Sequence, residues 1–322
     1  MTNNVQDSIS KEIWLVKGLA IFTVFFAHMP ISESNHSVFI LQRLFSIIGM
    51  VGVPAFMFLS GYLFKKGNIK KRMAGLLIPL LIWGSITFLL HIIPMKCHCS
   101  LWDYFYWLIG SNCYLYFVTV LFEIILLYNL CGNPFLWAII GILSIWASQQ
   151  GLIGYTLHYT PYMNPLNFIL YFSLGVIVRK TKYYDQLKNP IIVFTGLIVV
   201  LVPFFNYNHY TSVWYFDLTS MIVCLGATIL IINIAPFLKT KPLTRVGMFS
   251  YVIYLSHMQI ATTLNKILQV ALPGYLEVVK VLIAFIIAVA FVKMIYYFLN
   301  KRHALNIMRF LGYRQVLSQK IS

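Results

Sequence analysis

Two ionisable side chains lie eleven residues apart in the first long apolar segment of the chain, which runs from Lys11 to Pro30. In a helix, Lys17 and His28 would project from nearly the same face, about 16 Å apart along the axis. Ionisable groups within membrane-spanning helices are rare and usually face a bundle interior or a water-filled cavity. An imidazole suits proton transfer near neutral pH, which makes His28 the first candidate for catalysis. The alternative is a lysine that reaches the headgroups and a hydrogen-bonded interfacial histidine.

Later apolar segments contain further polar residues that are candidates for the same site. Ser250 and His257 are seven residues apart, and Tyr254 lies one helical turn from each, so the three share a helical face. This stripe either surrounds a catalytic group or joins helices through hydrogen bonds. Glu123 is the only acid well inside an apolar segment. Its carboxylate either pairs with His28 and fixes the imidazole tautomer, or forms a structural ion pair.

The composition predicts a polytopic membrane protein. Of the 322 residues, 60% are hydrophobic and 10% are charged, against about 25% charged residues in ordinary soluble domains. The net charge of +16 lies in short clusters between apolar segments, which favours membrane lipids over nucleic acid as partners. The first apolar segment is too long for a cleaved signal peptide, so we expect it to be retained. Residues 1–322 are expected to form a single integral membrane domain.

Ten apolar segments predict an all-α bundle of about ten transmembrane helices. They cover roughly 13–31, 44–64, 73–94, 114–131, 134–150, 165–179, 190–206, 213–235, 246–268 and 276–299. Basic residues cluster after every second segment and in the tail: Lys65, Lys66, Lys70, Lys71, Arg72, Arg179, Lys180, Lys182, Lys188, Lys239, Lys241, Arg245, Lys301, Arg302, Arg309, Arg314 and Lys320. The intervening loops hold chiefly Arg43 and Lys96. By the positive-inside rule, both termini are cytoplasmic.

The loops predicted to lie outside are rich in aromatic and amide side chains, over residues 155–167 and 206–217. Such loops form either a sugar-binding cleft, with Trp214 and Asp217 as candidate substrate-binding residues, or an interfacial aromatic belt. Another outer loop contains Cys97, His98, Cys99 and Cys113. Their spacing disfavours zinc, so no metal site is predicted. A disulfide from Cys113 to Cys97 or Cys99 is favoured if that loop faces an oxidising compartment.

Five stretches, in order, are similar to motifs of the acyltransferase family 3 integral membrane proteins. They are Lys17 with His28 after ten intervening residues, GMVGVPAFMFLSGYLFKK (49–66), KKRMAGLLIPLLIW (70–83), YLYFVTVLFEIILLY (114–128) and LTRVGMFSYVIYLSHMQI (243–260). The chain also departs from the family pattern at several positions. Trp14 stands where an acid is frequent, Lys17 replaces an arginine, and Tyr116 stands where tryptophan is usual. Lys71 and Arg72 occupy the place of a pair of arginines.

The resemblance implies transfer of an acetyl or other short acyl group from cytoplasmic acyl-CoA to a hydroxyl of a cell-surface polysaccharide or its lipid-linked precursor. It implies a multi-pass protein of the bacterial plasma membrane, with acetyl-CoA as donor substrate and no permanently bound cofactor. His28 would act as general base, while Lys17, Lys70, Lys71 and Arg72 either hold the donor phosphates or serve membrane topology alone.

No Gly-x-Ser-x-Gly elbow is present, so direct attack by the acceptor hydroxyl is expected rather than an acyl-serine intermediate. One alternative is a glycan exporter or flippase with a family-like fold, which would need no CoA. Another is an acyltransferase for a small molecule or a lipid.

Overall fold

The computed structural model describes residues 2–28, 36–65, 67, 69–95, 100–111, 114–156, 158–205, 216–238, 240–271 and 277–313. Its elements over these ranges are all helical. The helices are α1 (Thr2–Ala27), α2 (His36–Tyr62), α3 (Ile69–Met95), α4 (Leu101–Leu108), α5 (Tyr116–Leu130), α6 (Pro134–Gln149), η1 (Pro161–Met163), α7 (Leu166–Thr181), η2 (Gln186–Lys188), α8 (Pro190–Phe205), α9 (Leu218–Ile234), η4 (Ala235–Leu238), α10 (Lys241–Ala271), α11 (Glu277–Lys301) and α12 (Leu305–Phe310).

Each predicted apolar segment corresponds to one long helix, so the all-α prediction is confirmed over the described residues. Four helical stretches are long and apolar enough to cross a membrane by length and composition: Ile69–Ile93, Pro161–Thr181, Leu218–Leu238 and Val278–Lys301. Shorter apolar helices cover Ile47–Tyr62, Tyr116–Leu130, Pro134–Gln149 and Pro190–Leu201. The full count of ten spans and the cytoplasmic location of both termini stay predictions.

Two short helices were not predicted. Helix α4 begins with a capping box, in which the backbone N–H and hydroxyl of Ser100 both donate to Asp103 and the Ser100 hydroxyl accepts from the Asp103 amide. These hydrogen bonds from Ser100 lower the pKa of the Asp103 carboxyl. Helix α12 is tied back to the bundle because the Trp83 indole on α3 donates to the Leu311 carbonyl just beyond it.

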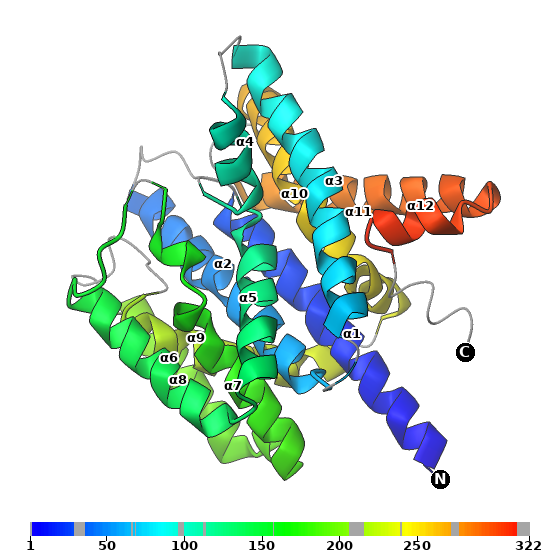
Figure 1. The fold of residues 1–322 in the computed structure, drawn as a ribbon. Coiled ribbons are helices and arrows are strands. Elements are labelled where there is room, and N and C mark those ends of the chain that lie inside the picture. Colours follow the sequence, from blue (N-terminus) through cyan, green and yellow to red (C-terminus); the bar gives the residue numbers. More distant parts are fainter. Residues whose placement is uncertain are drawn as a thin grey trace.

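Helix α1 lies at the centre of the bundle, between α2 and α10 (Figure 1). Its Val16, Ala20 and Ile21 side chains are fully buried. The neighbouring helix α10 approaches so closely that a Cβ on Gly247 would lie 1.7 Å from the Trp14 carbonyl oxygen. Such close helix contacts through small residues are characteristic of membrane bundles. This packing fixes α1 and α10 in register, and those two helices contain most of the candidate catalytic residues.

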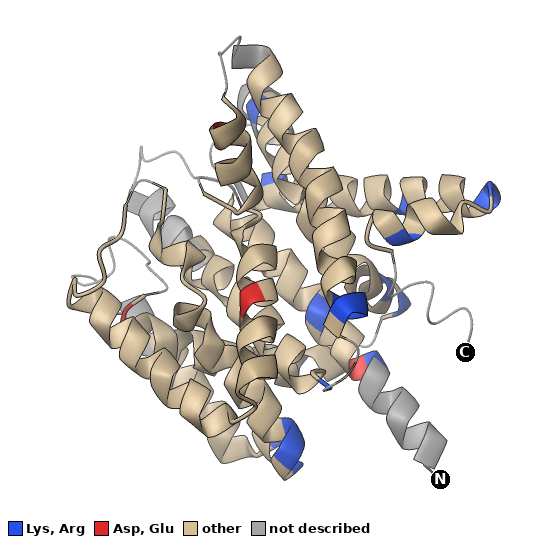
Figure 2. Ribbon diagram, in the orientation of Figure 1, with Lys and Arg blue, Asp and Glu red and all other residues tan. Residues whose placement is uncertain are grey.

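The helices on the periphery differ from α1 because they expose large apolar side chains. Ile139 on α6, Phe194 on α8 and Ile286 on α11 are each more than half exposed, as expected of surfaces that contact lipid. The basic segments gather toward the end of the bundle where α1 begins, at the start of α3 and the end of α7 (Figure 2). Arg179 and Lys180 in the last turn of α7 belong to this group.

Candidate active site

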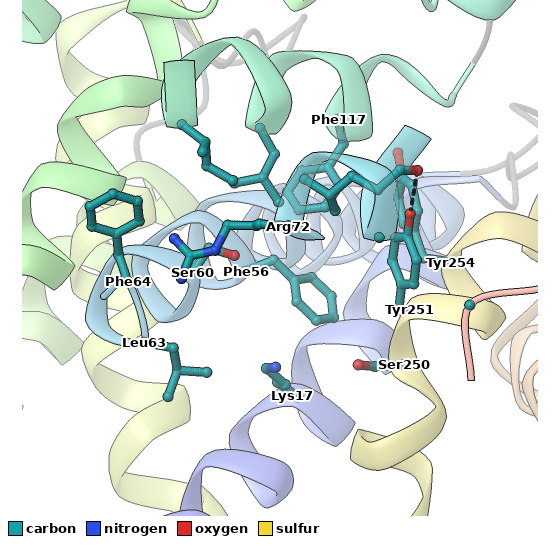
Figure 3. A pocket seen from close by; sticks show the side chains of 15 residues that line it. Lys17, Phe56, Ser60, Leu63, Phe64, Arg72, Phe117, Ser250, Tyr251 and Tyr254 are labelled. Carbon is teal, nitrogen blue, oxygen red and sulfur yellow. Dashed lines mark hydrogen bonds between the residues drawn. The ribbon is translucent and has the colours of Figure 1, made fainter. Parts of the chain in front are cut away.

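A cavity of about 370 Å³ opens beside the Lys17 side chain. We name it the lysine cavity; Lys17, Ser60, Arg72, Ser250, Tyr251 and Tyr254 are among the residues that line it. These residues come from α1, α2, α3 and α10, and α5 adds Phe117 to the lining, so the site depends on the packing of five helices. The Lys17 and Ser250 side chains lie at one end of it and Arg72 lies across from them (Figure 3).

Lys17 is a buried cation, with 7% of its surface exposed. Its Nζ atom lies 4.7 Å from the centroid of the Trp14 ring, and among the described residues no carboxylate forms an ion pair with it. A buried charge is costly unless it is paired or meets a ligand. The lysine cavity therefore offers an unneutralised positive charge to an anionic ligand.

The basic residues at the start of α3 differ in their positions. Arg72 lines the lysine cavity, donates to the Lys65 carbonyl oxygen at 3.0 Å and has its guanidinium carbon 4.8 Å from the Phe64 ring centroid. Lys70 and Lys71 are exposed and are not among the lining residues. Of the three predicted donor-binding residues on α3, the structure brings only Arg72 to the same cavity as Lys17.

A second cavity, of about 620 Å³, opens beside His28. This histidine cavity is lined by residues that include His28, Gly49, Tyr114, Tyr116, Tyr162, Tyr254 and Met258. His28 directly follows the last helical residue of α1, and its backbone N–H donates to the Phe25 carbonyl at 3.2 Å. Other lining residues come from the start of α5 and from η1, which contains Tyr162.

The imidazoles of His28 and His257 are neighbours. The ring centroids of His28 and His257 lie 5.0 Å apart, and His257 is fully buried. The His257 Nδ1 atom contacts the Tyr254 carbonyl oxygen at 2.5 Å. Because a carbonyl only accepts, Nδ1 bears the hydrogen and the Nε2 atom of neutral His257 is an acceptor. That Nε2 atom is buried and has no hydrogen-bond partner among the residues that the structure describes.

Tyr254 lines both cavities and is the wall that they share. Its hydroxyl donates to the Tyr114 backbone carbonyl, and its ring packs on Phe117 with centroids 5.1 Å apart. The Tyr114 hydroxyl in turn bonds to the Leu255 carbonyl at 2.8 Å. The Tyr114 ring meets His257 edge-on at 4.9 Å. These contacts hold α5 against α10 where the two cavities meet.

The part of the chain that contains most of both cavities matches a known protein family. A model of the acyltransferase domain of family 3 matches residues 11–297, which is most of the chain and includes every residue of both cavities except Gly312. The chain belongs to acyltransferase family 3. It is therefore a membrane acyltransferase. No curated protein and no solved structure matched it in the corresponding comparisons.

The structure gives a physical account of one departure from the acyltransferase family pattern. Trp14 stands where an acid is frequent, three residues before Lys17. Here the indole ring contacts the lysine amine, so a cation–π contact takes the place of an ion pair. An aromatic ring contacts the cation without forming an ion pair, so the amine stays available to an anionic ligand.

Glu123 does not join the acyltransferase site in the predicted way. Within the part of the chain that the structure describes, no ion pair or hydrogen bond links it to His28, and its Oε2 atom is buried without a partner. On α5, Phe117, Leu121 and Ile125 line the lysine cavity. Glu123 lies two residues from Leu121, about 200° around the helix, and so points away from that face.

The structure describes only some of the outer-loop candidates, and the sugar-binding role of this region stays a prediction. Asp217 caps α9: its carboxylate accepts from the Ser220 backbone N–H at 2.7 Å and from the Ser220 hydroxyl at 2.6 Å. Trp214 lies outside the described residues, as do Cys97, His98, Cys99 and Cys113. In the loop over 155–167, Asn167 accepts from Ser144 at 2.8 Å, so this amide secures the loop to α6.

Several lining residues were missed by sequence reasoning. Tyr114 and Phe117 belong to the quoted fourth motif, but nothing in their spacing distinguishes cavity residues from packed ones. Gly312 lines the lysine cavity from beyond α12, a region with no apolar segment to reveal it. By contrast, the predicted stripe of Ser250, Tyr254 and His257 does lie at the site: the first two line cavities and the third contacts His28.

Proposed function

We propose that the protein is an O-acyltransferase that moves an acetyl or other short acyl group from cytoplasmic acyl-CoA to a hydroxyl of a cell-surface polysaccharide or its lipid-linked precursor. The observation that supports it is the shared Tyr254 wall, with the cations Lys17 and Arg72 on one side and the His28 imidazole on the other. An acyl transfer from a phosphate-rich donor needs both groups: charge to hold the donor and a base for the acceptor.

In this proposal the lysine cavity receives the donor. Lys17 and Arg72 attract the CoA phosphates, and the narrow pantetheine arm directs the thioester toward Tyr254. Binding energy collected at the phosphates, remote from the reacting carbon, then serves to position the thioester. The acceptor hydroxyl enters the histidine cavity from the opposite side, where tyrosine rings provide the flat surfaces on which sugars bind.

The chemical step is direct attack. The acceptor oxygen bonds to the thioester carbonyl carbon while His28 takes the hydroxyl proton. The tetrahedral intermediate collapses as its carbon–sulfur bond breaks, and the proton passes from His28 to the departing CoA thiolate. The Tyr114 and Tyr254 hydroxyls already donate to backbone carbonyls. We therefore assign the oxyanion to the Tyr116 phenol, which also lines the histidine cavity.

His257 acts as a positioning residue in this mechanism. Its Nδ1–H is used by the Tyr254 carbonyl, and its unpartnered Nε2 lone pair is available to an N–H of the adjacent His28 ring. When the N–H of one His28 ring nitrogen donates to His257, the other ring nitrogen of His28 keeps the lone pair that a base requires.

The test is the thermal stability of the detergent-purified protein with three ligands: acetyl-CoA, CoA, and adenosine 3′,5′-bisphosphate, which lacks the pantetheine arm. A ligand at 100 times its dissociation constant stabilises the folded state by about 2.7 kcal/mol. We expect both CoA species to raise the melting temperature above the effect of the bisphosphate. A folded protein that responds to none of the three would contradict the proposal and favour an exporter.

A further inference from the structure

A third cavity, of about 700 Å³, lies at the end of the bundle where α1 begins. We name it the basic cavity; its lining includes Lys11, Glu12, Lys188, Lys241, Thr244 and Arg245. It has no lining residue in common with the lysine or histidine cavities. Leu15, another lining residue, is two residues from Lys17 and therefore about 200° around α1 from it. Helix α1 thus separates the basic cavity from the proposed donor site.

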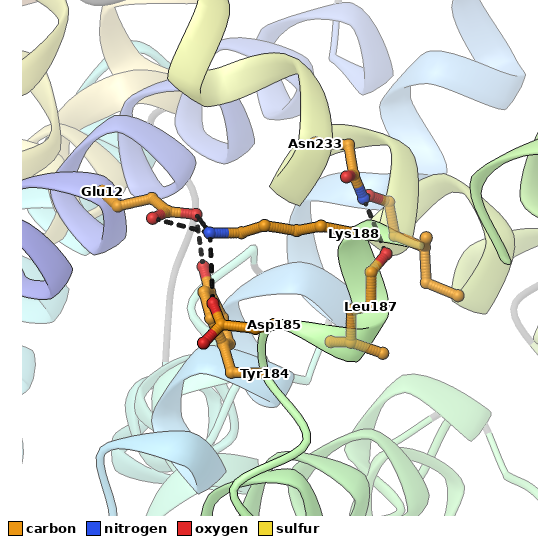
Figure 4. Close-up of polar contacts among 7 residues, drawn as sticks. Glu12, Tyr184, Asp185, Leu187, Lys188 and Asn233 are labelled. Carbon is orange, nitrogen blue, oxygen red and sulfur yellow. Dashed lines mark hydrogen bonds and ion pairs between the residues drawn. The ribbon is translucent and has the colours of Figure 1, made fainter. Parts of the chain in front are cut away.

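The charges of the basic cavity are strongly unbalanced. The Glu12 carboxylate pairs with the Lys188 amine at 2.9 Å and accepts from the Tyr184 hydroxyl at 3.2 Å (Figure 4). Burial, and secondarily the Glu12 charge, raise the pKa of Tyr184, so this phenol stays a donor. The one acid of the lining is therefore occupied. Lys11, Lys241 and Arg245 have no acidic partner among the described residues.

An exposed apolar surface adjoins these cations. Pro236, on the short helix η4, lines the cavity, and the next residue, Phe237, is 89% exposed. Ile234, at the end of α9, is 48% exposed. A ligand with a negatively charged head and an apolar body matches this combination, because its charge would meet the three cations while its body covers Phe237.

We propose that the basic cavity binds a phosphate group, and that its source is the headgroup of an anionic phospholipid. A free phosphate would use the same cations but would leave Phe237 uncovered. The inference is independent of the proposed function, because it concerns a cavity on the other side of α1 and is measured by lipid binding rather than by acyl transfer.

The experiment compares melting temperatures of the full-length protein in a neutral detergent at constant ionic strength. The probes are dihexanoyl phosphatidylglycerol, dihexanoyl phosphatidylcholine and inorganic phosphate, each titrated without CoA. The test variant is Lys241→Gln/Arg245→Gln. The matched control is Lys180→Gln/Arg302→Gln, which removes one lysine and one arginine from exposed positions outside all three cavities.

We expect phosphatidylglycerol to stabilise the wild type saturably and phosphatidylcholine to have little effect. The test variant should bind phosphatidylglycerol about 30-fold more weakly, since each cation near a membrane surface contributes about a fivefold factor, while the control should retain wild-type binding. Saturation by inorganic phosphate at similar concentrations would support the phosphate site but assign it to a free anion. Equal effects of the two lipids without any phosphate response, or equal losses in test and control variants, would overturn the proposal.

A second double variant is used if the first one fails to fold. If Lys241→Gln/Arg245→Gln does not melt cooperatively, Lys11→Gln/Arg245→Gln replaces it, since Lys11 belongs to a different helix. Weaker phosphatidylglycerol binding by a variant that still melts cooperatively would support the assignment. Wild-type lipid affinity in a cooperatively melting variant would contradict it.

Discussion

The lysine and histidine cavities share one tyrosine but differ in every group that bears charge or moves protons. Among the described residues, the lining of the lysine cavity contains two cations, Lys17 and Arg72, and no acid. The described lining of the histidine cavity contains an imidazole and several phenols, without a cation or an acid. Lys17 on α1 lines the first cavity, and His28, eleven residues later and directly after the end of α1, lines the second. This difference fits the proposed mechanism, in which the acyl-CoA donor binds near Lys17 and the proton is transferred at His28.

The side chains around His257 and around Lys17 also differ. Around His257 the chain is tightly closed, with Phe25, Tyr114 and Tyr254 rings within 6 Å of the imidazole centroid. Such a rigid shell holds a proton acceptor in one orientation. Lys17 is also buried, but its amine is a point charge over the Trp14 ring beside a cavity, which suits contact with an anionic ligand.

The largest effect is expected from His28→Ala. Removing a general base typically slows a reaction by about 10²- to 10⁴-fold. Acyl transfer to the acceptor should fall by that factor, whereas stabilisation by acetyl-CoA should persist because the lysine cavity is intact. The checks are transfer of radiolabelled acetyl groups and the melting temperature with acetyl-CoA. Retained transfer would remove His28 from the role of base and would end the division between the cavities.

A smaller loss is expected from His257→Asn. The asparagine amide can still donate to the Tyr254 carbonyl, but it lacks the Nε2 lone pair that the proposed mechanism assigns to a hydrogen bond from His28. One hydrogen bond to a group that becomes charged corresponds to a loss of about 10- to 100-fold in kcat, without a change in KM for acetyl-CoA.

The pH dependence of kcat in His257→Asn distinguishes a residue that positions His28 from one that only packs in the core. A positioning role requires the pH dependence of kcat to shift in His257→Asn. An unchanged profile, with a lower melting temperature accounting for the loss, would make His257 a packing residue.

The sequence was sufficient for the elements and for the main polar residues of the site. The Lys17 to His28 spacing and the stripe on α10 were recognisable because a fixed helical period places such residues on one face. The pairing of His28 with His257 rather than with Glu123 was not predictable, since it depends on the rotation of α5 about its own axis. That rotation is set by long-range contacts such as the Tyr254 hydroxyl on the Tyr114 carbonyl, which no local pattern reveals.

A comparison of Lys17 with Lys70 tests whether the buried lysine binds the acyl-CoA donor. Lys17→Gln should weaken acetyl-CoA binding about tenfold, equivalent to about 1.4 kcal/mol, with kcat nearly unchanged. Lys70→Gln removes the same charge from an exposed position outside the lysine cavity, where screened interactions are worth little. Melting curves titrated with acetyl-CoA give both affinities. Equal weakening in the two variants would mean that general surface charge, rather than the buried Lys17, attracts the donor.

The smallest effect is expected from Glu123→Gln, which tests whether this acid belongs to either cavity. Its Oε2 atom is buried without a partner among the described residues, and the residue points away from the face of α5 that lines the lysine cavity. We therefore expect less than about a twofold change in acyl transfer, as for substitutions away from a site. The melting temperature should be unchanged or higher, because the neutral amide costs less to bury than a carboxylate. A loss of transfer comparable to that of His28→Ala would instead connect Glu123 to the imidazole pair, and the rotation of α5 in the active protein would then have to differ from the one described.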